Sequence, residues 1–66
     1  MTLDQYMKAN EITDDAMGKR LGVSRSAVTL YRNGDRMPKP EILIRLLNIT
    51  KEDVTVEDML AGLKRL

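Results

Sequence analysis

The chain of 66 residues contains no cysteine and no histidine. Without cysteine it has no disulfide framework and no thiolate metal site, and a reducing cytoplasm is the compartment that we expect. Without histidine, the commonest metal ligand and the commonest acid–base side chain are also missing. We therefore predict a protein that needs no metal and no cofactor.

A long apolar run is also absent. The most apolar stretch, residues 42–47, is interrupted by Arg45 and is far shorter than the roughly 18 residues of a membrane span. The first residues, MTLDQY, lack the basic segment and apolar stretch of a secretory signal. We expect a soluble, cytoplasmic chain.

The length of the chain limits its architecture. A chain this short removes only about 60% of its unfolded surface from water. Its stability must therefore come from well-formed helices, with a partner subunit as a further source. We predict one domain over residues 1–66.

Capping and periodicity signals predict helices and no β-sheet. Thr2 with Gln5 forms a capping-box pattern, and Thr13 and Ser24 are placed to cap two further helices. Pro40 suits the first position of another helix. Helices are expected over about residues 2–10, 13–22, 24–33, 40–47 and from Thr55 onward along an apolar stripe that reaches Leu66. The fold class is all-α, a compact bundle of four to five short helices.

The charged residues are segregated along the sequence, although the net charge is only +1. Residues 1–18 carry one basic and four acidic side chains, a net charge of −3. Residues 19–39 carry six basic side chains and one acidic side chain, a net charge of +5. Residues 40–66 carry four basic and five acidic side chains, a net charge of −1. The middle segment is therefore a basic island.

The third predicted helix has two chemically different sides. On a helical wheel, one side gathers residues that can pack: Ser24, Ala27, Val28 and Tyr31. The other side gathers polar residues: Arg25, Ser26, Thr29, Arg32 and Asn33. Arginine, hydroxyl and amide groups supply the donors and acceptors that meet base edges and phosphates in a major groove. This side is predicted to contact DNA.

Five positions around this helix form a recognisable pattern. They are a small residue in the preceding helix, a glycine at the turn, a hydrophobic residue, a capping serine and a β-branched core residue, here Gly18, Gly22, Val23, Ser24 and Val28. With them the segment 13–38 resembles the helix-turn-helix family of phage Cro proteins and lambda-type repressors. Residues 40–60 are similar to the two packing helices that usually follow. The resemblance implies a lambda-repressor-like DNA-binding fold.

Two glycines have physical reasons of their own. Gly18 would allow close approach of two helices, and that packing would compensate the roughly 1 kcal/mol that glycine costs in a helix relative to alanine. Gly22 permits the left-handed turn between the helices. The alternatives are a tolerated surface glycine at position 18 and a simple helix stop at position 22.

The resemblance also implies two sets of DNA contacts. The base-reading set is Ser24, Arg25, Ser26, Thr29 and Leu30, with Arg25 as the guanine reader. The phosphate-contacting set is Lys19, Arg32, Asn33, Arg36 and Lys39, which would fix register without carrying sequence information. For any single lysine or arginine, the alternative is a solvated surface position.

Three positions depart from the family pattern. Asp14 stands where a glutamine usually contacts phosphate, and since a carboxylate is repelled there, we expect no phosphate contact from it. Leu30 replaces a residue that is often polar; it either touches a thymine methyl group or packs or lies exposed. Arg32 stands where many relatives have glutamate, and it either contacts phosphate or forms a surface ion pair.

Such small domains gain specificity when two copies bind a two-fold symmetric site, with their recognition helices about 34 Å apart. The apolar stripe of the last helix offers a dimer interface through Met59, Leu63 and Leu66; the alternative is that the stripe lies wholly in the core. Adjacent carboxylates such as Asp14 and Asp15 do not share a helix face, so they form no active site.

The sequence thus predicts a non-enzymatic, sequence-specific regulator of transcription that binds double-stranded DNA. We expect a phage or prophage repressor of Cro type, a homodimer on its operator with its third helix in the major groove, near the nucleoid of a bacterial host and without a membrane partner. Two alternatives stay open. One is a protein-interaction module on the same fold, such as an antitoxin or an adaptor, and the other is the DNA-binding head of a larger repressor.

Overall fold

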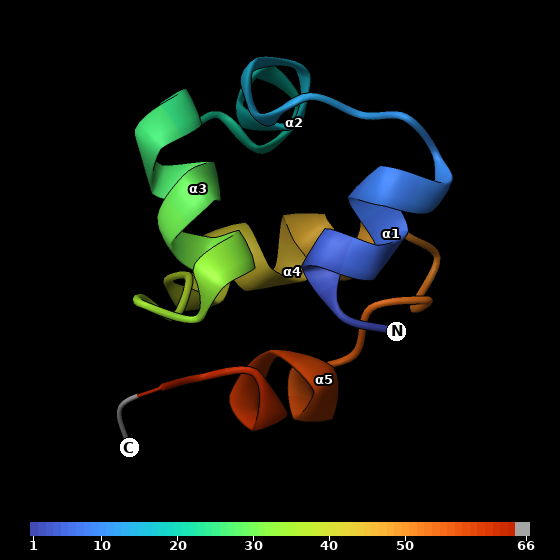
Figure 1. Ribbon diagram of the computed structural model, residues 1–66, viewed down its shortest axis with the longest axis vertical. Coiled ribbons are helices and arrows are strands. Elements are labelled where there is room, and N and C mark those ends of the chain that lie inside the picture. The colour runs from blue at the N-terminus through green and yellow to red at the C-terminus, as the bar shows by residue number, and fades with distance from the viewer. Residues whose placement is uncertain (65–66) are drawn as a thin grey trace.

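A computed structural model describes residues 1–64, which form five helices and no strand. The helices are α1 (Leu3–Ala9), α2 (Asp14–Leu21), α3 (Arg25–Asn33), α4 (Pro40–Ile49) and α5 (Val56–Ala61). In Figure 1, α2 lies at one end of the molecule, α3 runs down one side from it, and α5 lies at the opposite end. The predicted all-α class is confirmed.

The predicted helix starts are confirmed by their caps. The hydroxyl oxygens of Thr2, Thr13, Ser24 and Thr55 each accept a hydrogen bond from the backbone N–H three residues on. Such caps contribute about 1 kcal/mol each, because they satisfy donors that a helix start leaves unpaired. Pro40 occupies the first turn of α4, where its missing N–H leaves no bond unmade.

Two predicted helix ends were wrong. The fourth helix runs two residues past Leu47, to Ile49. The fifth ends at Ala61 instead of continuing along the apolar stripe, and residues 63–64 are not helical. The reason is a competing backbone contact: the N–H of Lys64 donates to the carbonyl of Gly34, at 2.9 Å. Leu66 lies outside the described residues.

That contact brings the chain after α5 against the end of α3. Gly34 ends α3 in a left-handed conformation, with φ of +77°. A side chain there would collide with the carbonyl oxygen of Gly62. Glycine is required at position 34 for both reasons.

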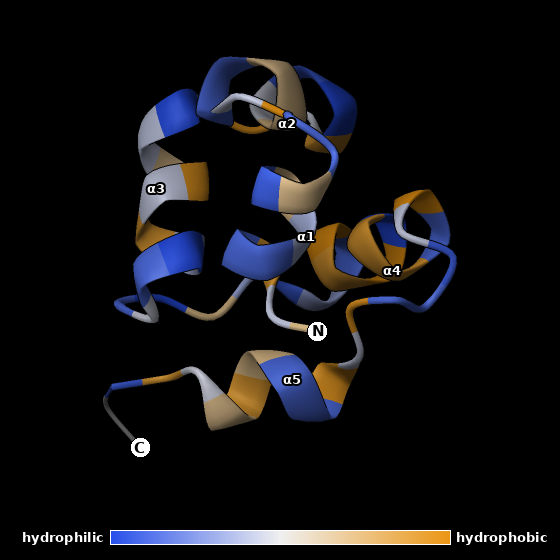
Figure 2. Cartoon of the chain, turned by 45° about the vertical axis from the view of Figure 1, so that its right-hand side comes forward, coloured by the Kyte–Doolittle hydropathy of each residue, from blue (hydrophilic) through white to orange (hydrophobic). Residues whose placement is uncertain are grey.

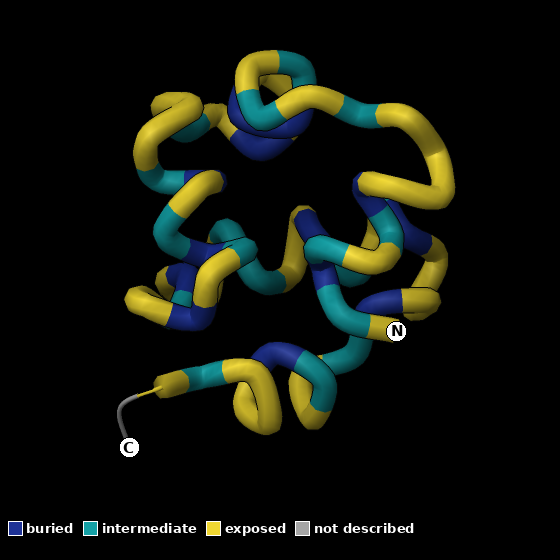
Figure 3. Tube along the Cα trace, in the orientation of Figure 1, coloured by how far each residue is buried: buried dark blue, intermediate teal, exposed yellow. Residues whose placement is uncertain are grey.

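The core is assembled from one side of every helix. Its buried apolar members are Leu3, Met7, Met17, Leu21, Val28, Tyr31, Leu46, Val54 and Met59. Figure 3 shows buried stretches of the chain, in dark blue, on every helix, and Figure 2 shows that α4 is the most uniformly apolar helix. Each fully buried aliphatic side chain contributes about 1.5–3 kcal/mol relative to an exposed one.

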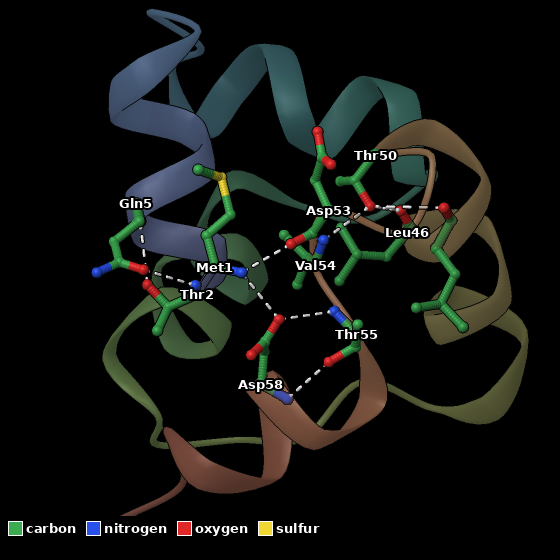
Figure 4. Close-up of polar contacts among 10 residues, drawn as sticks. Met1, Thr2, Gln5, Leu46, Thr50, Asp53, Val54, Thr55 and Asp58 are labelled. Carbon is green, nitrogen blue, oxygen red and sulfur yellow. Dashed lines mark hydrogen bonds and ion pairs between the residues drawn. The ribbon is translucent and has the colours of Figure 1, made fainter.

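A chain of polar contacts holds the loop between α4 and α5 (Figure 4). The buried hydroxyl of Thr50 donates to the carbonyl of Leu46 at 2.9 Å and accepts from the N–H of Val54 at 3.4 Å. The amino group of Met1 donates to the carbonyl of Asp53 at 2.8 Å and to the carboxylate of Asp58 at 3.0 Å. The start of α1 and the start of α5 are thereby joined to the same loop.

The turn between α2 and α3 depends on Gly18. A Cβ added to this buried residue would lie 2.7 Å from the carbonyl oxygen of Val23, which belongs to the turn. The packing interpretation of Gly18 is therefore confirmed. Gly22 has φ of +76°, so the predicted left-handed turn is confirmed as well. Beside it, Nη1 of Arg45 donates to the carbonyl of Leu21 at 3.0 Å and satisfies the end of α2.

Replacement of Gly18 by alanine tests this packing. Alanine normally favours a helix by about 1 kcal/mol over glycine, but here we expect a loss of about 1–3 kcal/mol because the backbone of the turn must move. The measurement is urea unfolding followed by far-UV circular dichroism. Gly62→Ala is the matched control, since its Cβ would meet only the carbonyl oxygens of Asp58 and Met59, at the ordinary distances of 3.5 and 3.8 Å. A Gly18→Ala protein as stable as the wild type would contradict the packing argument.

Candidate nucleic-acid interface

The outer side of α3 is polar and exposed. Arg25, Ser26, Thr29 and Asn33 are exposed, whereas Val28 is fully buried and Tyr31 is 8% exposed. Leu30, at the boundary, is half-buried. The structure buries and exposes the two sides that the helical wheel predicts, with two exceptions. Ser24 is exposed and caps the helix, and Arg32 is half-buried.

A shallow groove separates the start of α2 from the outer side of α3. It is lined by Ile12, Thr13, Asp14, Asp15, Arg25, Ser26, Thr29 and Arg32. Three members of the predicted base-reading set, Arg25, Ser26 and Thr29, therefore lie along one groove. Its opposite wall carries the carboxylates of Asp14 and Asp15, so the groove has walls of opposite charge.

Arg32 joins three helices. Its Nε and Nη2 donate to Oδ1 of Asp4 on α1, at 2.9 and 2.6 Å, and its Nη1 donates to Oδ1 of Asp14 on α2, at 2.5 Å. The Arg32 side chain is 21% exposed. Of the two interpretations made from sequence, an ion pair is present, and a phosphate contact by the remaining donors stays a prediction.

Both carboxylates are held in the ionised form. The pKa of Asp14 lies below its ordinary value of 3.8, first because the hydroxyl of Thr29 donates to it and then because Arg32 does. The pKa of Asp4 is lowered by its hydrogen bonds to Lys8 and then to Arg32. These carboxylates lower the positive charge at the last turn of α3.

Most of the predicted phosphate-contacting side chains are exposed. Lys19, Asn33, Arg36 and Lys39 are exposed, and Lys19 pairs with Asp15 at 3.3 Å. That pair lies on the helix surface, so it holds the lysine only weakly. Among residues 1–64, Arg36 and Lys39 make no ion pair, and neither does Arg25 of the base-reading set.

The residues predicted for a dimer interface differ in how far they are exposed. Met59 is only 6% exposed and belongs to the core of its own chain, as the alternative interpretation has it. Leu63 is half-buried. On α5 the large apolar side chains that are exposed are Val56 (39%) and Leu60 (45%), one turn apart on the helix.

Sequence reasoning missed Asp4 and Arg45 as parts of this region. Asp4 reaches Arg32 across 28 residues and Arg45 reaches Leu21 across 24. No spacing rule links residues so far apart in sequence. The unusual arginine at position 32, together with the acidic first third of the chain, was the available signal.

Comparison with known proteins agrees with this geometry. A model of the helix-turn-helix family matches residues 3–56. The chain belongs to this family. The resemblance to Cro proteins and lambda-type repressors is thereby confirmed.

The helix-turn-helix chain also has a curated relative. It is 35% identical over 60 residues to YqaE of Bacillus subtilis (strain 168), described as an uncharacterised HTH-type transcriptional regulator. The alignment covers 91% of this chain and 50% of YqaE, so the chain spans half the length of the relative. No solved structure matches the chain significantly.

Other types of site are not found in the described part of the chain. Over residues 1–64, no helix has the length and hydropathy needed to cross a bilayer. The same residues hold no cluster of three or more aspartate, glutamate, histidine or cysteine side chains arranged for a metal ion.

The ion-pair network predicts a pH-dependent contribution to stability. Because Asp4 is 36% exposed and water screens the pair, we expect Arg32→Gln to lower the free energy of unfolding at neutral pH by about 1 kcal/mol. The carboxylate pKa values are lowered on folding, so the stabilisation is full above 3.8 and is lost as the pH falls through the folded-state values below it.

Urea unfolding of both proteins over a pH series measures this difference. The stabilities should differ at neutral pH and converge in acid. Asp15→Asn is the control, because it breaks only an exposed pair within one helix and should change stability by less than about 0.5 kcal/mol. A constant difference at every pH would contradict the ionic origin.

Proposed function

We propose that the protein is a sequence-specific regulator of transcription that binds double-stranded DNA with α3 in the major groove. The observation that carries the proposal is the arrangement of α3 in a chain of the helix-turn-helix family. Its inner side is buried, and its outer side presents Arg25, Ser26 and Thr29 to the surroundings. An arginine can read guanine O6 and N7 in two hydrogen bonds, and short hydroxyls fit beside it.

The distribution of positive charge supports contact with the DNA backbone. Lys19 lies on α2, Asn33 at the end of α3, and Arg36 and Lys39 in the loop that follows. Lys19 precedes α3 in the sequence, and Arg36 and Lys39 follow it. In the proposed complex they bind phosphates on either side of the groove and fix the position of the helix, with Arg32 as a further contact from its remaining donors.

The regulator that we propose is of Cro type, acting on phage or prophage genes in a bacterial cytoplasm by occupying an operator and excluding polymerase or a competing regulator. The proposed role is to bind DNA, and no catalytic activity is part of the proposal. The name of YqaE, a transcriptional regulator, is consistent with this proposal.

We propose that the regulator binds its operator as a homodimer through α5. Val56 and Leu60 provide the exposed apolar surface, and Leu63 continues it. Two domains on a two-fold site place their recognition helices one helical turn of DNA apart, about 34 Å.

Titration with DNA tests the proposed function. Fluorescence anisotropy with an operator selected from a random duplex library and with an unrelated duplex, each at two salt concentrations, should show tighter binding to the operator. Affinity for both should fall as salt rises, because bound phosphates release counterions. Equal, salt-insensitive binding to both duplexes would contradict the proposal.

Two variants sharpen this titration. Arg25→Ala should lose about 1–3 kcal/mol on the operator and little on the unrelated duplex, because a base contact is removed. Lys39→Ala should weaken both complexes equally and reduce the salt dependence. An adaptor or antitoxin on the same fold would show neither pattern and would keep its protein partner in the Arg25→Ala variant.

The proposed dimer predicts a two-fold symmetric operator. It also predicts that a charged residue in the apolar surface of α5 prevents two copies from binding the two half-sites together. Leu60→Glu should remain folded by circular dichroism, because Leu60 is 45% exposed, but should bind operator as a monomer with at least about 10-fold weaker affinity. Sedimentation velocity of the complexes measures the stoichiometry. Unchanged 2:1 binding by the variant would exclude this surface.

A further inference from the structure

Thr29 lies on the exposed side of α3 with its hydroxyl between two acceptors. Its Oγ1 is 2.5 Å from Oδ2 of Asp14 and 3.1 Å from the backbone carbonyl oxygen of Arg25. A hydroxyl has one hydrogen and two lone pairs. An ionised carboxylate and a carbonyl only accept, so the hydrogen of Thr29 is directed into the protein toward one of them.

Asp14 is itself fixed in place. Its Oδ1 accepts from Nη1 of Arg32, and its Oδ2 accepts from Thr29, so its two oxygens have different partners. Arg32 is held in turn by Asp4 on α1. The bond from Thr29 is charge-assisted, which makes it roughly twice as strong as the bond to a neutral carbonyl.

We propose that Asp14 is a positioning residue that makes Thr29 a hydrogen-bond acceptor toward DNA, and so a reader of bases that carry a major-groove amino group. This inference rests on the proposed function. In the major groove, cytosine presents its N4 amino group and adenine its N6 amino group, whereas guanine presents N7 and O6 and thymine presents O4, all acceptors. Thr29 therefore selects cytosine or adenine on the strand that it contacts.

The same geometry explains how an aspartate is tolerated beside a DNA-binding helix. Thr29 and Arg32 satisfy the carboxylate, and Arg32 offsets its charge, so Asp14 acts through Thr29 instead of through a phosphate. A threonine without such a partner serves as donor or acceptor and reads either kind of base. Asp14 removes that ambiguity.

Substitution by asparagine is the most direct perturbation. In Asp14→Asn, Arg32 continues to hold the side-chain oxygen, so the amide nitrogen faces Thr29 and donates to its hydroxyl. Without the carboxylate as its acceptor, the hydrogen of Thr29 becomes free to donate to a base acceptor such as guanine O6 or thymine O4. The discrimination in favour of amino-bearing bases should therefore relax or reverse.

The experiment is selection of bound duplexes from a random library with the wild type and three variants, each confirmed as folded by circular dichroism. Affinities are then measured on single-base variants of the selected site. Thr29→Val, which keeps the β-branched shape, identifies the operator position read by Thr29. At that position the wild type should prefer cytosine or adenine by about 10-fold, and Asp14→Asn and Thr29→Val should reduce this to less than about 3-fold.

One variant serves as a matched control. Asp15→Asn removes a neighbouring carboxylate that pairs with Lys19 and not with Thr29. It should keep the wild-type base preference, whatever its effect on overall affinity. A merely structural role for Asp14 would lower affinity for all sequences alike.

The outcomes separate the two proposals. A wild type that selects no sequence overturns the proposed function and this inference with it. A wild type that selects a site while Asp14→Asn keeps the same preference at the Thr29 position overturns the inference alone. If Asp14→Asn does not fold, Thr29→Val decides: no change of preference at any position overturns the inference, and a loss confined to one position that prefers cytosine or adenine supports it.

Discussion

The close approach of Gly18 to the carbonyl of Val23 is the constraint on which the interface depends. It allows α2 and the following turn to meet through their backbones, and the direction in which α3 leaves the turn follows from that meeting. With α3 so placed, the first turn of α2 lies beside its outer side. Asp14 can then reach both Thr29 and Arg32. The absence of a side chain at position 18 thus determines which residues of α3 Asp14 can contact.

The acidic start of the chain and its basic middle are complementary in space as well as opposite in charge. Asp4 and Asp14 neutralise Arg32, the most inward of the cations on α3. Within residues 19–39, the basic side chains that pair with no acidic residue of the described chain are Arg20, Arg25, Arg36 and Lys39. This distribution leaves the middle of α3 for hydroxyl groups and places the cations toward its two ends.

Local features of the fold were predictable from sequence because their causes are local. Caps at Thr2, Thr13, Ser24 and Thr55 act on amides three residues away, and the left-handed turn at Gly22 is a property of that residue. The end of α5 was not predictable, because it is decided by Gly34, which lies 30 residues before Lys64 in the sequence.

In the candidate site, too, the features with local causes were predictable and those that depend on distant residues were not. A wheel places Arg25, Ser26 and Thr29 on the polar side, since burial of Val28 and Tyr31 leaves no other orientation. It also places Arg32 there, and only the structure shows that Asp4 and Asp14 draw it inward. Met59 was ambiguous for a similar reason, because an apolar stripe does not reveal which of its edges faces the core.

The contact between Gly34 and residues 62–64 links the end of α3 to the chain that follows α5. The last turn of α3 cannot fray or rotate without breaking the hydrogen bond that Lys64 donates to Gly34. Conversely, a displacement of the chain after α5 would move the backbone of Gly34, next to Asn33, through the same hydrogen bond. Amide exchange at Lys64 and at the end of α3 should consequently belong to one cooperative opening unit, although these amides are far apart in the sequence.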